Sequence, residues 1–245
     1  MDICLDQLGI FFVLCCFIQG FRRNLFASYT DKHNLIKNLI LFARQPKLGE
    51  AKRRLAKDIG YVAAHNFYRS NLTTMAWKLG NDPRWRTSLF ASPDQSASNR
   101  KVWPVPSKIS IMKQGEGDIG HRMYRAFKSF PHEPCVIIGC DIPEVNRNDI
   151  LIAFRSLQKN KLVFGPASDG GFWLIGVKNP TIISEKIFSE VRWSTPNALN
   201  DTLSNLPKNF PINFVRELSD IDHGSSWHRW KIRKHSHKIG LECFP

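Results

Sequence analysis

The sequence lacks a hydrophobic run long enough to cross a membrane. Its apolar stretch at residues 8–18 covers eleven positions, whereas a membrane-spanning helix needs about 20. A signal peptide places positive charge before its apolar run, but Asp2 and Asp6 precede this one, and Arg22 and Arg23 follow it. Residues 1–35 are therefore expected to be an atypical N-terminal extension: an appended helix, a weak membrane-surface anchor, or the product of a start codon placed too far upstream.

The sequence also lacks cysteines at the spacing of metal-binding motifs, and it has few acidic residues. The six cysteines follow neither a zinc-site pattern nor that of a small disulfide scaffold, which favours reduced thiols in a cytoplasmic protein. Twenty-one acidic against thirty-five basic residues give a net charge of +14. This charge suits polyanionic ligands, nucleic acid or an anionic membrane surface. No zinc finger, aromatic RNP motif or basic-leucine pattern accompanies it, so no specific nucleic-acid partner is expected.

What the sequence does contain, over residues 36–222, is an alternation of short apolar runs with helical patterns. Hydrophobic residues make up 42% of the 245 positions, enough for a full core. The pattern predicts one α/β domain followed by a basic, His-rich tail at 223–245 that is solvated. Strands are predicted at 38–43, 86–91, 109–112, 136–140, 162–166, 172–177 and 212–215, and helices at 55–63, 61–79, 119–130, 147–159 and 197–206. Residues 92–108 are predicted to be a polar surface loop.

The run VIIGCDIP at 136–143 is typical of a central parallel strand, buried on both faces. Ligands of open α/β sheets bind beyond the carboxyl ends of such strands, where Asp141 lies. A carboxylate there can hold a divalent cation, although Asp141 could also simply cap the next helix. Asp220 and Asp222, two residues apart in an extended segment, point to one face and repel unless a cation sits between them or water screens them. They are candidate metal ligands beside Asp141.

The loop after the first strand is basic. Arg44, Lys47, Lys52, Arg53 and Arg54 crowd the start of a helix, and their charges oppose the helix dipole. A strand, a loop punctuated by Gly49 and a helix N-terminus form a general anion site, so a bound phosphate would give these cations a partner. The spacing matches neither a Walker A loop nor G-x-G-x-x-G, and a solvated basic face remains the alternative.

Two further loops carry candidate residues. At 117–120, Asp118 is most simply a helix cap, while Gly117 and Gly120 allow a close backbone approach to a ligand. At 167–171, the Asp169-Gly170 pair is a strong hairpin signal, but Asp169 could also face the same crevice as Asp141. Beyond these, Ser194 or Thr195 is expected to cap a helix that begins at Pro196, and Trp193 packs against either a ligand or the core.

Six blocks of the sequence also occur, in this order, in a known family. They are residues 38–60, 114–127, 136–143, 163–177, 188–195 and 218–222. Over residues 37–222 the chain resembles the bacterial glycosyltransferase-A-like family linked to arsenosugar biosynthesis, whose members often occur beside radical-SAM proteins. It is also similar to phospholactate guanylyltransferase and to molybdenum-cofactor nucleotidyltransferases.

The resemblance implies a three-layer GT-A fold, in which the Asp141 position coordinates a divalent metal. The family's Lys-Thr-Arg-Leu block falls on residues 52–55, with Arg53 in place of threonine. Its Gly-Tyr-Tyr segment becomes Gly171-Phe172-Trp173, which removes two hydroxyls, and His223 replaces a threonine after Asp222. These departures leave the metal and phosphate positions intact, but they make the acceptor specificity of the family an uncertain guide to this chain.

Together these observations predict a transferase that moves a sugar from a nucleotide-diphosphate donor to a small-molecule acceptor. In this hypothesis, Mg²⁺ or Mn²⁺ binds Asp141 with help from Asp220 or Asp222, and Asp169 is the catalytic base or contacts the sugar. The phosphate and nucleotide contacts are Arg44, Lys47, Gly49, Lys52, Arg54, Gly117, Asp118 and Gly120. Gly170, Gly171, Trp193 and Ser194 form the substrate pocket. The alternatives are a nucleotidyltransferase that releases pyrophosphate and a non-enzymatic polyanion-binding protein.

Overall fold

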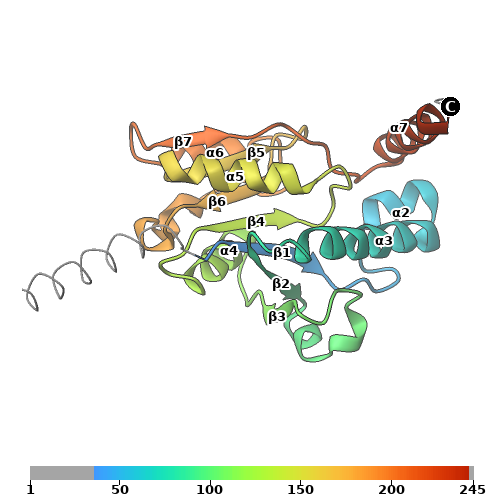
Figure 1. Cartoon of the computed structure of the whole chain (residues 1–245), viewed down its shortest axis with the longest axis horizontal. Helices are drawn as coiled ribbons and strands as arrows, with labels where there is room; N and C mark the ends of the chain where they lie inside the picture. Colours follow the sequence, from blue (N-terminus) through green and yellow to red (C-terminus); the bar gives the residue numbers. More distant parts are fainter. Residues whose placement is uncertain (1–35, 243–245) are drawn as a thin grey trace, which may run out of the picture. The chain divides into compact units, whose positions relative to one another are not determined.

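Strand β4 (Cys135–Gly139) lies in the middle of the sheet. Its apolar side chains alternate between the two sheet faces, and helices cover both faces. Residues 135–138 are all buried. The computed structural model describes residues 36–242, with side chains up to Lys234 (Figure 1). The N-terminal extension expected at residues 1–35 lies outside the described residues.

Seven strands form one mixed sheet in the order β3-β2-β1-β4-β6-β5-β7. The other strands are β1 (Asn38–Arg44), β2 (Arg86–Ser92), β3 (Ser110–Lys113), β5 (Leu162–Pro166), β6 (Phe172–Val177) and β7 (Ile212–Phe214). All neighbours pair in parallel except β6, which is antiparallel to both β4 and β5. Two reversals cancel, so β5 runs parallel to β4 and their carboxyl ends share one edge.

Helices cover both faces of this sheet. They are α2 (Arg53–Ile59), α3 (Tyr61–Gly80), α4 (Ile119–Lys128), α5 (Arg147–Lys159), α6 (Ala198–Ser204) and α7 (Gly224–Glu242). Alternate residues of β1 point to opposite faces: Leu39 and Leu41 join the core beneath α3 and α5, whereas Ile40 joins the core beneath α4. The predicted α/β architecture, a mostly parallel sheet between two helical layers, is confirmed (Figure 1).

Two segments differ from the expectation. Residues 92–108 contain the short 3₁₀ helices η2 (Asp94–Ser98) and η3 (Arg100–Val102), and Trp103 is buried in the core with its indole Nε1 donating to the Ser96 carbonyl. The segment after residue 222 forms the helix α7, which was not expected, although most of its side chains up to Lys234 are exposed. Trp227 and Trp230 of α7 pack against the small core between α2 and α3, and this apolar contact outweighs the charge around them.

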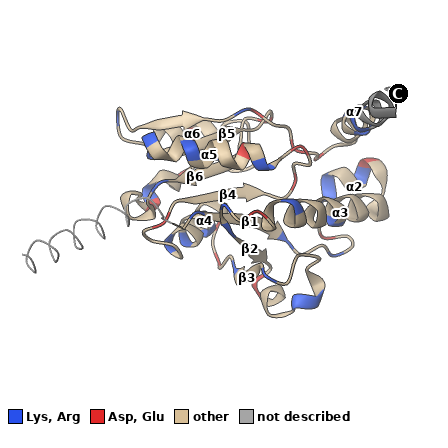
Figure 2. Ribbon diagram, viewed as in Figure 1, with Lys and Arg blue, Asp and Glu red and all other residues tan. Residues whose placement is uncertain are grey.

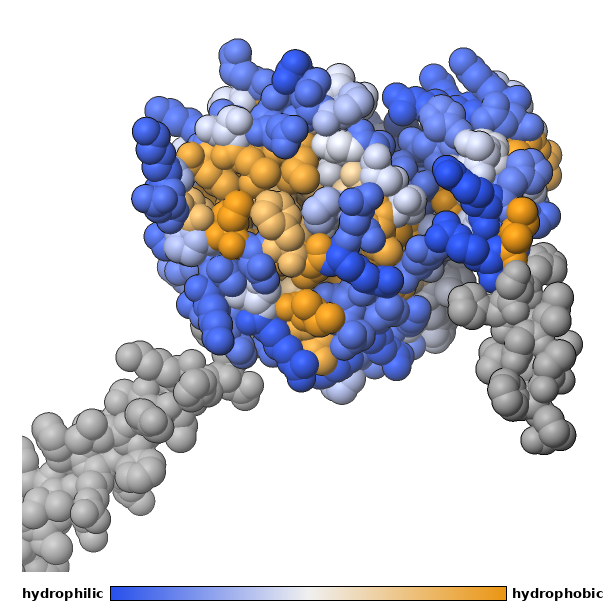
Figure 3. Space-filling model, turned by 90° about the horizontal axis from the view of Figure 1, so that it is seen from above, coloured by the Kyte–Doolittle hydropathy of each residue, from blue (hydrophilic) through white to orange (hydrophobic). Residues whose placement is uncertain are grey.

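The surface is mostly hydrophilic, with local apolar exceptions. Figure 3 looks down on the edge of the sheet formed by β7 and shows an apolar patch among polar side chains. Phe214 of this strand is 44% exposed. At three residues, β7 is a short edge strand, which limits the unpaired backbone it offers to other chains. Among the described residues, none of the helices has the length and apolar character needed to span a membrane.

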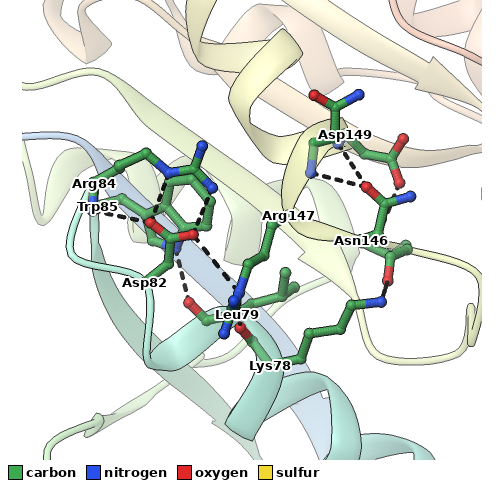
Figure 4. A network of polar contacts seen from close by, with 10 residues as sticks. Lys78, Leu79, Asp82, Arg84, Trp85, Asn146, Arg147 and Asp149 are labelled. Carbon is green, nitrogen blue, oxygen red and sulfur yellow. Dashed lines mark hydrogen bonds and ion pairs between the residues drawn. The ribbon is translucent and has the colours of Figure 1, made fainter.

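A polar network fastens the end of α3 to the start of α5, and so fixes the loop that follows β4 (Figure 4). Asp82 accepts two hydrogen bonds from the Arg84 guanidinium, at 2.8 and 2.6 Å, and Arg147 Nε donates to the Lys78 carbonyl at 2.7 Å. Asn146 and Asp149 form a capping box at the start of α5. The Asp149 carboxylate also accepts hydrogen bonds from Arg216 Nε at 2.6 Å and Nη2 at 2.8 Å. These bonds tie the loop after β4 to the segment after β7.

We predict that Asp149→Ala lowers the free energy of unfolding by about 2 kcal/mol, because it removes both a cap and the buried partner of Arg216. Urea unfolding followed by circular dichroism measures this loss. Glu217→Ala, which removes an exposed carboxylate one residue from Arg216, is the matched control and should change stability by less than about 0.5 kcal/mol. Equal losses in the two variants would contradict the role assigned to this network.

Candidate functional site

The carboxyl edge of the sheet gathers acidic residues from three segments. Asp141 follows β4, Asp169 lies in the loop between β5 and β6, and Asp220 and Asp222 lie in the segment after β7. Both interpretations of the Asp169 loop hold together: β5 and β6 form an antiparallel hairpin, and its loop lies at the Asp141 edge because β5 is parallel to β4. The Ile221 N–H bonds the Asp141 carbonyl at 3.4 Å and joins two of these segments directly.

Lys52 lies between two of these carboxylates. Its Nζ is 2.5 Å from Asp222 Oδ1 and 3.3 Å from Asp141 Oδ2, and its side chain is only 4% exposed. Burial of the ammonium disfavours its charge, but Asp141 and Asp222 outweigh this effect and raise the pKa of Lys52. The backbone at Lys52 is left-handed, with φ of 53°, which is uncommon for a residue other than glycine. Such strain persists where surrounding contacts impose it, and here two carboxylates hold the side chain.

Asp220 and Asp222 have opposite electrostatic environments. Burial disfavours the charge on Asp222, yet Lys52, with Arg54 Nη1 at 3.7 Å from Oδ2, lowers its pKa. For Asp220, burial and the charge of Asp222 raise the pKa to about 6, against the weaker opposing effect of Lys52. Within residues 36–234, no side chain forms a hydrogen bond or ion pair with the Asp220 carboxylate.

The chemistry of this edge fits a divalent cation, because hard oxygen donors gather there with more negative charge than Lys52 and Arg54 balance. Lys52 takes up one oxygen each of Asp141 and Asp222, and no three His, Cys, Asp or Glu side chains of the described part of the chain form a ready-made metal cluster. Asp141 and Asp220 keep oxygens that a cation could share.

A cleft of about 240 Å³ opens beside these carboxylates. Among the predicted residues, those that line it are Asp141, Asp169, Gly171, Trp193, Ser194 and Asp220. Its opposite wall is apolar and includes Phe42, Met123 and Phe172. Polar groups at one end of an apolar cleft are typical of small-molecule sites.

The loop that carries Asp169 is fixed in place. Asp169 Oδ1 accepts from the Gly171 N–H at 2.9 Å, and the Leu199 N–H donates to the Gly170 carbonyl at 3.1 Å. Gly170 has φ of +85°, and a Cβ there would come within 2.1 Å of the Pro196 carbonyl oxygen. Gly170 thus permits a close approach of two backbones, and it does not line the cleft.

The segment at 193–197 completes the wall. Trp193 packs against the core, with ring centroids 6.2 Å from Phe172 and 6.1 Å from Phe188. It also lines the cleft, and its contact with a ligand stays a prediction. Ser194 is exposed in the left-handed region, with φ of 61°. The helix expected to begin at Pro196 begins at Ala198, because Thr195 Oγ1 bonds the Asn197 N–H in a preceding turn.

The basic loop is only partly directed at this edge. The Lys47 ammonium lies 2.5 Å from Glu50 Oε1, and Arg44 is held through its backbone by the Tyr68 hydroxyl. Gly49 has φ of +79° with open space around it. Arg54, whose side chain is 60% exposed, remains at the edge beside Asp222.

The segment before α4 has a local structural role. Asp118 is the N-cap, as expected, and accepts from the His121 N–H at 2.9 Å. The Gly117 carbonyl accepts from Arg122 Nε at 2.8 Å. A Cβ at Gly120 would come within 2.6 Å of Phe188 Cβ, so this glycine serves close packing. None of the three lines the cleft.

Sequence reasoning missed the polar side chains that hold the loops of the site. Asn71 Nδ2 donates to the Cys140 carbonyl at 2.8 Å, directly before Asp141, and Gln114 Nε2 donates to the Ala43 and Phe90 carbonyls at 3.3 and 2.9 Å. Tyr68 and Asn71 both lie in the buried stripe of α3. Polar residues at apolar positions of a helical pattern were the available signal.

Comparisons with known proteins agree with this architecture. The model of DUF2064, a family described as an uncharacterized protein conserved in bacteria, matches residues 74–195. A "putative nucleotide-diphospho-sugar transferase" from Desulfovibrio desulfuricans G20 is 24% identical over 76% of this chain and 82% of its own, with a TM-score of 0.70. The fold is the predicted GT-A fold.

A second solved structure shares this GT-A fold at lower similarity. It is 4-diphosphocytidyl-2C-methyl-D-erythritol synthase from Anaerococcus prevotii DSM 20548, 10% identical over 78% of this chain and 94% of its own, with a TM-score of 0.51. No curated protein matches the chain. The link to arsenosugar biosynthesis and radical-SAM proteins is not among these findings and stays a prediction.

We predict that Lys52→Met lowers the free energy of unfolding by about 2 kcal/mol at pH 7, because it leaves two half-buried carboxylates without their shared cation. Adding Asp222→Asn should recover part of the loss, since it removes one of those charges. Lys57→Met, on the exposed face of the same helix, is the control and should change stability by less than about 0.5 kcal/mol. Chemical unfolding of the wild type and the three variants tests the stabilising role of the ion pair. A loss of unfolding free energy in Lys52→Met no larger than in Lys57→Met would contradict it.

We also predict that Asp220→Asn raises the melting temperature of the metal-free protein. Because the pKa of Asp220 in the folded protein is about 6, above its ordinary value, ionisation costs more in the folded state. Its destabilising effect therefore grows as the pH rises from about 4 to 6 and is complete above that range. Melting curves in EDTA should show the Asn variant more stable at pH 7.5 and the difference shrinking at pH 4. A difference that does not vary with pH, or one matched by Glu217→Gln, would contradict the assignment.

Proposed function

We propose that the protein is a metal-dependent glycosyltransferase that moves a sugar from a nucleotide diphosphate to a small-molecule acceptor. The observation that carries this proposal is the convergence at one sheet edge of Lys52 and Arg54 with the carboxylates of Asp141, Asp220 and Asp222. These cations and carboxylates come from segments far apart in the chain and lie beside a cleft that Asp169 also lines.

Each of these residues has a task that its environment supports. Arg54 is exposed at the edge and binds phosphate oxygens, for which a planar guanidinium is well suited. Lys52 holds the Asp141 and Asp222 carboxylates in place, and an ammonium with three donors keeps one for a phosphate oxygen. Asp141 and Asp220 would hold Mg²⁺ or Mn²⁺, which when bound neutralises the charge of the diphosphate leaving group.

Asp169 is the proposed general base. Its Oδ1 is engaged with the Gly171 N–H, which orients the carboxylate and leaves Oδ2 to accept a proton in the cleft. The acceptor hydroxyl oxygen then bonds to the anomeric carbon, and the bond from that carbon to the diphosphate oxygen breaks. The nucleoside diphosphate leaves with the electron pair, and the hydroxyl proton passes to Asp169. Trp193 and Phe172 form the apolar wall against which the sugar packs.

Nucleotidyl transfer is the alternative chemistry for the same residues. The basic loop and the metal carboxylates would then act on a nucleoside triphosphate, with attack on its α-phosphorus and release of pyrophosphate. The two reactions are told apart by the donor that binds and by the product that leaves.

We predict that one class of nucleotide raises the unfolding free energy in the presence of Mn²⁺. A ligand at a hundred times its dissociation constant adds about 2.7 kcal/mol, which a thermal shift detects easily. The effect should be lost in Asp141→Asn, reduced in Arg54→Ala and kept in Arg69→Ala, which removes an exposed arginine of α3.

The panel contains nucleotide sugars and nucleoside triphosphates. Stabilisation by a nucleotide sugar, with a nucleoside diphosphate released on turnover, supports glycosyl transfer. Stabilisation by a triphosphate, with pyrophosphate released, replaces it with nucleotidyl transfer. A folded protein whose stability changes with no member of the panel would overturn both transfer reactions and would favour polyanion binding without catalysis.

A further inference from the structure

A second and larger cleft, of about 740 Å³, lies between α7 and the loops that follow β4, β5 and β7. Its volume is in the range of small-molecule sites, about 300–1,000 Å³. Asp220 lines both this cleft and the smaller one that contains Asp141 and Asp169. The two clefts therefore meet at the acidic edge of the sheet.

The walls of the second cleft are mixed: apolar side chains such as Ile232 and Trp230 alternate with polar ones, several of which carry hydroxyl groups. Ser168 and Ser219 lie on the sheet side, with their Oγ atoms 2.9 Å apart. Ser226 lies on the α7 side and donates its hydroxyl hydrogen to the His223 carbonyl at 2.8 Å. Serine hydroxyls both donate and accept, so each retains hydrogen-bonding capacity for the hydroxyl groups of a ligand.

Arg229 and Arg233 of α7 line the far wall and give it a positive charge. Figure 2 marks basic positions in blue on the described part of this helix. Arg233 Nη1 pairs with Glu144 Oε1 at 3.1 Å, and both residues line the cleft. Arg229 is exposed, and within residues 36–234 no carboxylate lies within ion-pair distance of its guanidinium. A guanidinium in a cleft binds phosphate or carboxylate through parallel N–H donors.

The helix that carries Arg229 is held firmly on the domain. Trp230 packs edge-on against Phe67 of α3 with ring centroids 5.2 Å apart, and the Gly224 N–H donates to Asp58 Oδ2 at 2.7 Å. Ile221, directly before α7, is buried in the same small core. The cleft wall is therefore built into the fold.

We propose that this cleft binds the second substrate of the transfer reaction: a small polyhydroxylated molecule that carries a phosphate or carboxylate group. The proposal rests on the proposed function for its assignment as acceptor. Arg229 binds the anionic group, the serines bind hydroxyls, and the end of the molecule nearest Asp220 reaches the junction with the first cleft. The sugar donor and the acceptor thus approach the acidic edge from opposite sides.

Isothermal titration of glucose 6-phosphate and gluconate into the nucleotide- and Mn²⁺-loaded protein tests the proposal, with glucose as the uncharged counterpart. At least one of the two anions should bind and glucose should bind more weakly. Arg229→Ala should weaken that binding about tenfold or more, as expected for the loss of a charge-assisted hydrogen bond. Arg155→Ala, which removes an exposed arginine of α5 that lines neither cleft, is the matched control and should bind as the wild type does.

Ser226→Trp, which fills the cleft from a position on the same helix as Arg229, provides a second variant. It should block the anion and leave stabilisation by the nucleotide unchanged. Equal affinities in wild type and Arg229→Ala would overturn the proposal, as would failure of both anions to bind the loaded wild-type protein. If no nucleotide binds, the proposed function fails. An Arg229-dependent titration of the nucleotide-free protein would in that case still support an anion site in this cleft.

Discussion

The rest of the site depends on one ammonium group held between two carboxylates. Lys52 contacts Asp141 and Asp222, so it joins the start of α2, the end of the central strand and the last loop of the sheet at a single point. Without a cation there, three aspartates would repel one another at a partly buried edge. Lys52 pairs with two of them but not with Asp220, whose pKa stays raised although Lys52 opposes the shift. The arrangement therefore favours an additional cation beside Asp220, and the left-handed backbone at Lys52 is the local strain that the arrangement imposes.

The reversed direction of β6 shapes the other half of the site. A hairpin needs only a short loop, and because β6 runs against both of its neighbours, the loop of residues 167–171 returns to the edge where β4 ends. The close contact of Gly170 with Pro196 then fixes the segment that carries Trp193. Topology and one glycine thus place Asp169 opposite an aromatic wall without a long insertion. The second cleft is formed on the far side of the same loops, where α7 closes it.

The sequence predicted the strands, the position of Asp141 at the end of the central one, and the cap at Asp118, because these depend on local patterns of burial and turn chemistry. It did not predict that Lys52 would be buried, since lysines are exposed unless paired and its partner Asp222 is 170 residues away. It also missed the helix α7 and its docking on the domain. Trp227 and Trp230 are three residues apart and share a helix face, a signal that the surrounding Lys, Arg and His residues concealed.

Because α7 completes the core between α2 and α3, the nascent chain cannot close this core until α7 has been synthesised. A ribosome produces Lys52 early, but one of the two carboxylates that hold it, Asp222, comes late. Ile221 and Trp230, which cover the apolar face of Phe67, also come late. Local contacts form before such distant ones, so the helices can form while this face and the strained lysine still lack their partners. Closure of the α2–α3 core and assembly of the acidic edge are then one late event. A polypeptide that ends before residue 222 would expose the apolar surface around Phe67 to chaperones. It would also lack the Asp222 carboxylate of the site.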